Sequence, residues 1–147
     1  MKRTVCLDFD GVCNLYDGWK GEDELFMPRP GLASFICQLL DAGKRVAIFS
    51  TRQPAKLEAW FRTNQPASAP FIENGEIFFP DKKPPADCYV DDRGVRFNGD
   101  FDAIMPQILG FKAHWEKMTL DEAILNAGDD ETITVERDGT VSLGVAS

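Results

Sequence analysis

The sequence predicts an α/β fold in which a mostly parallel sheet is flanked by helices. Short apolar runs rich in strand-forming residues alternate with longer runs of helical period, and polar clusters follow several of the strand-like runs. Parallel neighbours in a sheet need a long crossover connection, which is usually a helix, so this alternation indicates βαβ units. A chain of 147 residues is long enough for one such domain to bury a hydrophobic core.

The strands are expected where β-branched, aromatic and other apolar residues cluster over a few positions. The first of these runs comes almost at the N-terminus. The expected strands are Thr4–Phe9, Arg45–Phe49, Phe71–Ile72, Ile77–Phe79, Asp87–Val90 and Val95–Phe97.

Two amphipathic helices are expected between these strands. Pro30-Gly31 opens a run whose apolar residues, from Leu32 to Leu40, recur at helical spacing, and Gly43 is a typical stop. Pro54 suits the first turn of a second helix, whose inward stripe is Leu57, Trp60 and Phe61. Between the first strand and the first helix, residues 13–29 lack a helical period and are expected to form a loop or small flap.

The C-terminal part is expected to differ from the rest. A third helix is predicted over Phe111–Ala127. Residues 132–136 and 140–143 then alternate in polarity around Asp138-Gly139, which is a strong β-hairpin signal. We therefore expect a domain over residues 1–116 and an extension, helix plus hairpin, over residues 117–147. The extension offers a surface for self-association.

Composition and charge restrict the partners. Sixteen basic against twenty-four acidic residues give a net charge of −8, which repels nucleic acid and anionic membranes at long range. A small-molecule partner is therefore favoured over a long nucleic acid. No apolar stretch approaches the roughly 18 residues that span a bilayer, and the N-terminus runs directly into a strand rather than forming a signal peptide.

The four cysteines have no metal-binding spacing, so a reduced, cytoplasmic protein is expected. Cys6 and Cys88 lie in strand-like runs and are expected to be buried as small hydrophobic side chains.

Asp8 and Asp10 are the strongest functional signal in the chain. They end the first apolar run one residue apart, where side chains of a strand face the same way, and Gly11 permits a sharp turn. Two like charges held together are costly unless a cation lies between them. The pair therefore predicts a divalent metal site.

Two further polar clusters follow later strands. Ser50-Thr51 ends the strand at Arg45–Phe49, and Asp91-Asp92 ends the strand at Asp87–Val90. Ligands of open α/β sheets bind at the carboxyl ends of the strands. We therefore expect these clusters to form one site with Asp8 and Asp10.

The order of these elements resembles the haloacid dehalogenase-like (HAD) superfamily of phosphotransferases. The matching segments are Asp8-Phe9-Asp10-Gly11-Val12, Ile48-Phe49-Ser50-Thr51-Arg52, Lys83, and Tyr89-Val90-Asp91-Asp92-Arg93. Residues 16–21, within the expected flap, and the segment Lys83-Pro84-Pro85-Ala86 look like the matching segments of small, capless, phage- and bacteria-type hydrolases of that superfamily. The resemblance covers residues 3–116 and implies a single Rossmann-like domain without a large cap.

This resemblance implies a Mg²⁺-dependent phosphatase that hydrolyses phosphoric monoesters through an aspartyl-phosphate. Asp8 would attack phosphorus and Asp10 would act as general acid and base. Asp91, assisted by Asp92, would hold Mg²⁺ together with Asp8 and the backbone carbonyl of Asp10. The substrate is expected to be a nucleotide, a phosphosugar, a phosphoprotein or a nucleic-acid end.

Ser50 would bind a phosphoryl oxygen and Lys83 would supply positive charge, with Thr51 and Lys82 as the alternatives. Three arginines could bind a second substrate anion or form surface salt bridges: Arg52, Arg93 and Arg96. In the flap, Tyr16 and Trp19 could stack on a substrate ring or pack within the flap. His114 is expected to be a helix residue outside the site.

Two competing classes remain to be weighed. A response-regulator receiver domain also uses aspartyl-phosphate and Mg²⁺, but its adjacent acidic pair follows the first strand, whereas here the adjacent pair comes late. The order argues against that class. A catalytically silent binding or interaction protein with the same fold is the alternative to the enzyme.

Overall fold

The computed structural model describes residues 2–116, 124, 127–128 and 131–145. The chain divides into two compact units, Met1–His114 and Trp115–Ser147, a division two residues before the boundary expected from the sequence. Each unit is described by itself. No helix in the described part of the chain combines the length and the apolar character needed to cross a membrane.

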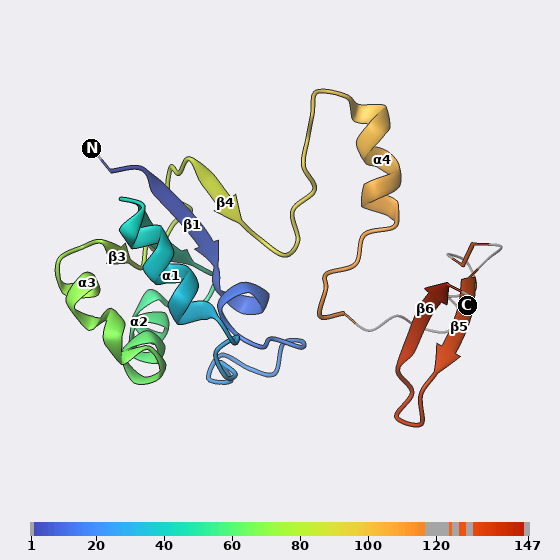
Figure 1. Cartoon of the computed structure of the whole chain (residues 1–147), viewed down its shortest axis with the longest axis horizontal. Coiled ribbons are helices and arrows are strands. Elements are labelled where there is room, and N and C mark those ends of the chain that lie inside the picture. The colour runs from blue at the N-terminus through green and yellow to red at the C-terminus, as the bar shows by residue number, and fades with distance from the viewer. Residues whose placement is uncertain (1, 117–123, 125–126, 129–130, 146–147) are drawn as a thin grey trace. The chain divides into compact units, whose positions relative to one another are not determined.

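A four-stranded parallel sheet organises the first unit, with the strands in the order β3-β2-β1-β4 (Figure 1). The α/β class with a parallel sheet flanked by helices is thereby confirmed. The strands are β1 (Thr4–Asp8), β2 (Arg45–Phe49), β3 (Ile77–Phe78) and β4 (Cys88–Val90).

The register of the sheet aligns the ends of three strands. Leu7 of β1 lies opposite Ile48 of β2 on one side and Val90 of β4 on the other. The residues that follow these three positions therefore emerge at the same edge of the sheet. This edge is where the polar clusters of the sequence are brought together.

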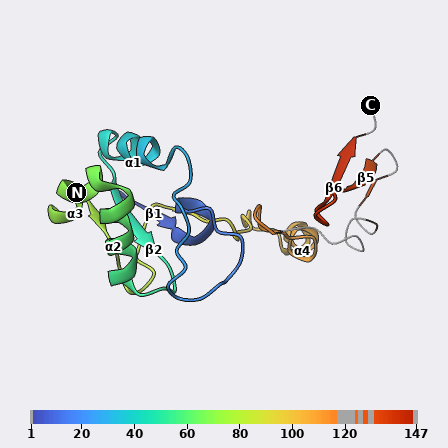
Figure 2. The same ribbon diagram turned by 90° about the horizontal axis from the view of Figure 1, so that it is seen from below.

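Helices of the first unit connect the strands (Figure 2). A five-residue turn, η1 (Phe9–Cys13), follows β1, and its backbone is not helical at Asp10 and Gly11. The helices α1 (Leu32–Asp41) and α2 (Pro54–Asn64) lie between β1 and β2 and between β2 and β3. Gly31 has the positive φ of 91° that directs the chain into α1, and Pro54 occupies the first turn of α2, where its missing N–H is no loss. The remaining helices are η2 (Pro66–Ser68), α3 (Ala69–Glu73) and α4 (Phe101–Leu109).

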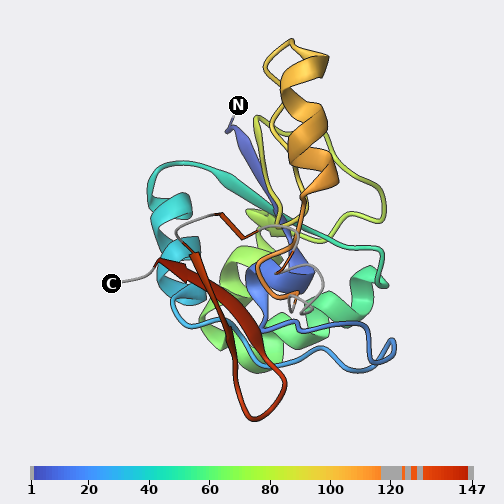
Figure 3. The ribbon, with the colours of Figure 1, turned by 90° about the vertical axis from the view of Figure 1, so that its right-hand side faces the viewer.

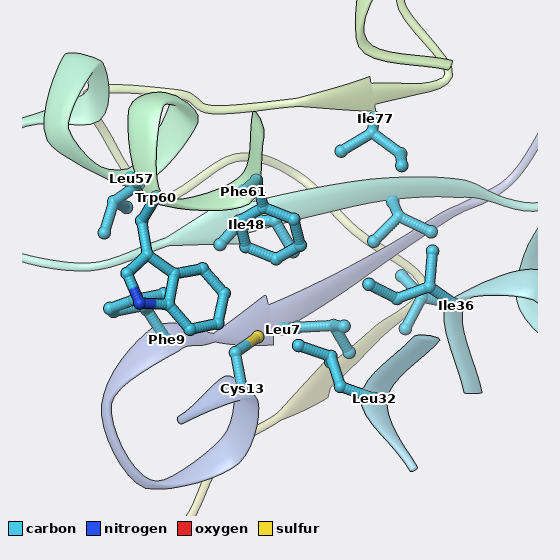
Figure 4. Close-up of a cluster of buried hydrophobic side chains, with 12 residues drawn as sticks. Leu7, Phe9, Cys13, Leu32, Ile36, Ile48, Leu57, Trp60, Phe61 and Ile77 are labelled. Carbon is cyan, nitrogen blue, oxygen red and sulfur yellow. The ribbon is translucent and has the colours of Figure 1, made fainter. Parts of the chain in front are cut away.

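One face of the sheet carries the hydrophobic core (Figure 4). Side chains two apart along a strand share a face, so Val5 and Leu7 of β1 lie with Val46 and Ile48 of β2 and Ile77 of β3. Both α1 and α2 bury their apolar stripes in this cluster. The helix residues that contribute are Leu32 and Ile36 of α1 and Leu57, Trp60 and Phe61 of α2.

Two expected strands are wrong. Phe71–Ile72 belongs to α3, because Pro70 at its first turn favours helix and two apolar residues are too few to establish a period. Both side chains still pack against the core, now from a helix. Residues 95–97 join no strand, and β4 is the edge of the sheet.

Two other expectations need correction, and one helix was not predicted. The helix predicted from Phe111 does not begin there, since 111–116 are not helical, and most of 117–127 lies outside the described residues. The sequence analysis did not anticipate α4, which Asp100 caps through its side chain. Cys88 is exposed because β4 is an edge strand, whereas Cys6 and Cys13 are buried. All four cysteines are free thiols.

The second unit contains the predicted hairpin (Figure 3). Strands β5 (Glu131–Val135) and β6 (Val141–Val145) pair antiparallel, with Ile133 opposite Leu143. Gly139 has a φ of 86°, which explains the glycine of the Asp138-Gly139 turn.

We predict that Leu57→Ala lowers the free energy of unfolding by about 2–5 kcal/mol, because it leaves a cavity in the core between α2 and the sheet. Leu57 has no exposed surface, whereas Leu109 on α4 is 80% exposed. The matched control Leu109→Ala should change stability by no more than about 0.5 kcal/mol. Urea unfolding followed by circular dichroism measures both, and equal losses would contradict the core described above.

Candidate active site

Three carboxylates meet where β1 and β4 end. Asp8 is the last residue of β1, and Asp91 and Asp92 follow β4 directly. One ligand oxygen from each of the three lies within 4.8 Å of the others, close enough for a single cation to contact all three. The side chain of Asp10, the fourth acidic residue of the predicted site, is not part of this group.

The concentration of negative charge changes the acidity of Asp8. Its pKa rises from 3.8 to about 8, first because the carboxyl is buried and then because it shares a hydrogen bond with Asp92. The charges of Asp91, Asp92 and Asp10 add to the effect. A cation in this position would favour the ionised carboxylate that burial and repulsion disfavour.

Asp10 is held by two donors instead of by the acidic group. Its Oδ2 accepts a hydrogen bond of 2.8 Å from Arg52 Nε, and its Oδ1 accepts one of 3.0 Å from Asn14 Nδ2. The backbone is extended at Asp10 and left-handed at Gly11, where φ is 89°. This turn separates the Asp10 side chain from that of Asp8 and requires the glycine.

Arg52 connects Asp10 to the flap, which we define as residues 13–29. The guanidinium is buried, and its Nη1 donates to the carbonyls of Gly21, at 3.1 Å, and Glu22, at 2.9 Å. It also stacks against the Trp19 ring, with Cζ 4.6 Å from the centroid. Arg52 therefore holds Asp10 and the flap in place and does not line the pocket described next.

A pocket of about 420 Å³ opens above the acidic group. Its walls combine the ends of β1, β2 and β4 with the flap and with Lys83. The lining residues are Cys6, Asp8, Asp10, Tyr16, Trp19, Phe49, Ser50, Thr51, Lys83, Tyr89, Val90, Asp91 and Arg93.

The pocket includes most of the candidate substrate contacts. Ser50 and Thr51 both line it, so the choice between them stays open. Ser50 Oγ accepts the backbone N–H of Arg52 at 3.1 Å, which leaves its own proton available to donate. Lys83 lines the pocket with its Nζ 4.4 Å from the centroid of the Tyr89 ring, whereas Lys82 is not among the lining residues.

The structure also shows which aromatic residues of the flap and which arginines reach the pocket. Tyr16 and Trp19 of the flap both line the pocket, and so does Arg93. Arg96 is not among the lining residues. Of the three arginines, Arg93 is therefore the one positioned to meet a second anionic group of a substrate.

The sequence analysis missed two residues at the site. Asn14 accepts the backbone N–H of Gly11 at 2.9 Å while it donates to Asp10, a role that its position three residues after the glycine could have indicated. His114 was expected outside the site, but its Nε2 lies 2.7 Å from the carbonyl oxygen of Gly11. No local sequence signal indicates that contact, because 103 residues separate the two.

No protein-family model, curated protein or solved structure matches this chain. A function is therefore inferred from the residues of the site and their geometry.

We predict that the metal-free protein loses stability as the pH rises from about 5 to about 8. The pKa of Asp8 is about 8 in the folded protein, against 3.8 for an ordinary aspartate, so the folded state retains a proton that the unfolded state releases. The stabilisation from this proton is complete below pH 3.8 and is lost as the pH rises through about 8. Melting temperatures measured across this range in a chelating buffer should fall more steeply for the wild type than for Asp8→Asn.

The control for this experiment is Asp41→Asn, at the exposed end of α1. It should retain the wild-type dependence on pH. If Asp8→Asn and the wild type have parallel curves, Asp8 does not titrate as described.

We predict that Arg52→Ala lowers the free energy of unfolding by about 3 kcal/mol or more, because it leaves Asp10 and two flap carbonyls without their donor. Arg62→Ala, which removes an arginine from the exposed side of α2, should cost no more than about 0.5 kcal/mol. Urea unfolding compares the two. A nearly neutral Arg52→Ala would instead indicate a surface arginine available to substrate.

Proposed function

We propose that this protein is a Mg²⁺-dependent phosphomonoesterase that acts through an aspartyl-phosphate on Asp8. The observation that carries the proposal is the convergence of Asp8, Asp91 and Asp92 within 4.8 Å, beside Asp10 and beneath a pocket. The resemblance of the same residues to the HAD superfamily points to the same chemistry. A Rossmann-like domain without a large cap is part of this proposal.

The residues present fit a magnesium ion. Carboxylate oxygens are hard ligands of the kind that Mg²⁺ prefers, and three of them are within reach of one position. We propose Asp8, Asp91 and Asp92 as side-chain ligands, with the Asp10 backbone carbonyl beside them. When bound, the ion would supply the positive charge that lets a carboxylate approach a phosphate anion.

Asp8 is the proposed nucleophile. One of its oxygens attacks phosphorus, the new O–P bond forms, and the bond from phosphorus to the leaving oxygen breaks. Asp10 donates a proton to that leaving oxygen, so that the product is released as an alcohol. This first displacement produces an aspartyl-phosphate and free alcohol.

Asp10 then reverses its role. It takes a proton from a water molecule that attacks the same phosphorus, and the bond between Asp8 and phosphorus breaks to release inorganic phosphate. Both oxygens of Asp10 accept hydrogen bonds in the structure, from Asn14 and Arg52. For proton transfer, one of them must exchange its partner for the leaving oxygen or the water.

The phosphoryl group would be held by donors around the pocket. The Ser50 hydroxyl, or that of Thr51, would donate to a phosphoryl oxygen, and Lys83 would balance its charge. All three of these residues line the same pocket as Asp8. The pocket volume of about 420 Å³ and the net charge of −8 favour a small phosphate ester over a long nucleic acid.

One observation favours the alternative, a catalytically silent binding protein with this fold. The ion pair between Arg52 and Asp10 has a distance of 2.8 Å and a fully buried arginine side chain. A carboxylate held so firmly by a buried cation is well suited to a structural role. Turnover by the purified protein decides between the two functions.

We predict Mg²⁺-dependent release of p-nitrophenol from p-nitrophenyl phosphate. Asp8→Asn should abolish turnover because the amide cannot attack phosphorus, and Asp10→Asn should lower kcat by about 10²–10⁴. Addition of a chelator should remove the activity, and excess Mg²⁺ should restore it.

The control is again Asp41→Asn, which should turn over at the wild-type rate. The panel is extended to nucleotides, phosphosugars and phosphorylated DNA ends. A folded wild type that releases no phosphate from any of them would contradict the enzyme and leave the binding protein.

A further inference from the structure

His114 joins two parts of the candidate site that are far apart in the sequence. It follows α4 near the end of the first unit, and its Nε2 lies 2.7 Å from the carbonyl oxygen of Gly11. The same nitrogen lies 4.0 Å from Oδ2 of Asp92. The imidazole therefore contacts the turn after β1 and lies close to the acidic pair after β4.

The contact with Gly11 identifies which ring nitrogen of His114 is the hydrogen-bond donor. A carbonyl oxygen only accepts hydrogen bonds, so Nε2 carries a proton and donates it. The same nitrogen lies 4.0 Å from the Asp92 carboxyl group, whose side chain is only 3% exposed. The N–H group thus donates to a backbone carbonyl, and a buried carboxyl group lies next to the same ring nitrogen.

The carbonyl of Gly11 belongs to a turn whose two peptide planes are both held. On one side, Gly11 N–H donates to Asn14 Oδ1 at 2.9 Å. On the other, Gly11 O accepts from His114 and from Arg29 Nη2, the latter at 3.1 Å. Gly11 has no Cβ and can therefore adopt many backbone conformations. These contacts hold it at a φ of 89°.

The orientation of Gly11 determines where the Asp10 carbonyl points. The C=O of Asp10 and the N–H of Gly11 belong to one planar trans peptide and point in opposite directions. A turn that is free to rotate at Gly11 would therefore let this carbonyl turn away from the acidic group. His114 is placed to prevent that rotation from the carbonyl side of Gly11.

We propose that His114 is a positioning residue for the metal site, which holds the Asp10–Gly11 turn and the Asp92 carboxylate at a fixed separation. The inference rests on the proposed function, because it presumes that the acidic group binds a divalent cation. It assigns no proton transfer to His114. Its effect is on the affinity for the cation, through the backbone carbonyl and through Asp92.

The test measures cation binding directly, without turnover. Mn²⁺ is titrated into the full-length protein, and the free ion is quantified by electron paramagnetic resonance. His114→Phe keeps a planar ring and removes the donor, whereas His114→Gln places an amide N–H at nearly the same distance along the side chain. Gln107→Ala, on the exposed surface of α4, is the matched control.

We expect His114→Phe to weaken Mn²⁺ binding by about tenfold, the lower end of the loss seen when a residue supporting metal ligands is removed. His114→Gln and Gln107→Ala should both stay within about threefold of the wild type. A general loss of structure would not be rescued by glutamine. Thermal melting of each variant establishes that it is folded.

The inference is overturned alone if the wild type binds Mn²⁺ and His114→Phe binds it within about twofold as well. If the wild type binds no Mn²⁺, the proposed metal site and the inference fail together. Should His114→Phe not fold, His114→Asn replaces it, since its shorter side chain brings the amide donor short of Gly11 O. Asparagine and glutamine variants of equal affinity would then overturn the inference.

Discussion

The parallel pairing of β1 with both β2 and β4 is the constraint on which the candidate site depends. Leu7 lies opposite Ile48 and Val90, so the next residues of all three strands leave the sheet at one edge. A shift of one residue in either pairing would turn the side chains of that strand to the opposite face. The core on one face, formed with α1 and α2, therefore also determines which groups meet at the edge.

That arrangement collects negative charge, and the rest of the site compensates for it. Burial first, and then the hydrogen bond with Asp92 and the neighbouring acidic charges, raise the pKa of Asp8 to about 8, which is a cost to the metal-free protein at neutral pH. Arg52 relieves part of the charge by taking Asp10 into a separate ion pair. An unfavourable concentration of charge, with a strongly shifted pKa, in an otherwise consistent structure is typical of functional sites.

Much of the fold was predictable because its signals are local. The strand at Arg45–Phe49 and the helices that begin near Leu32 and Pro54 are confirmed, each from a clear period and a proline or glycine at its boundary. The errors fall on short apolar segments. Phe71 and Ile72 are buried in either a strand or a helix, so their composition could not separate the two, and Cys88 is exposed only because β4 has one neighbour.

The sequence by itself determined which acidic and hydroxyl residues follow the strands, since the order of Asp8, Asp10, Ser50 and Asp91 along the chain does not depend on packing. Only the tertiary structure decided what these residues touch. Arg52, for which the sequence left a substrate contact and a salt bridge both open, lies buried beneath the flap in an ion pair with Asp10. His114 comes from beyond α4 to contact Gly11. Such contacts join residues dozens of positions apart, and they follow from the path of the folded backbone and not from any pattern along the chain.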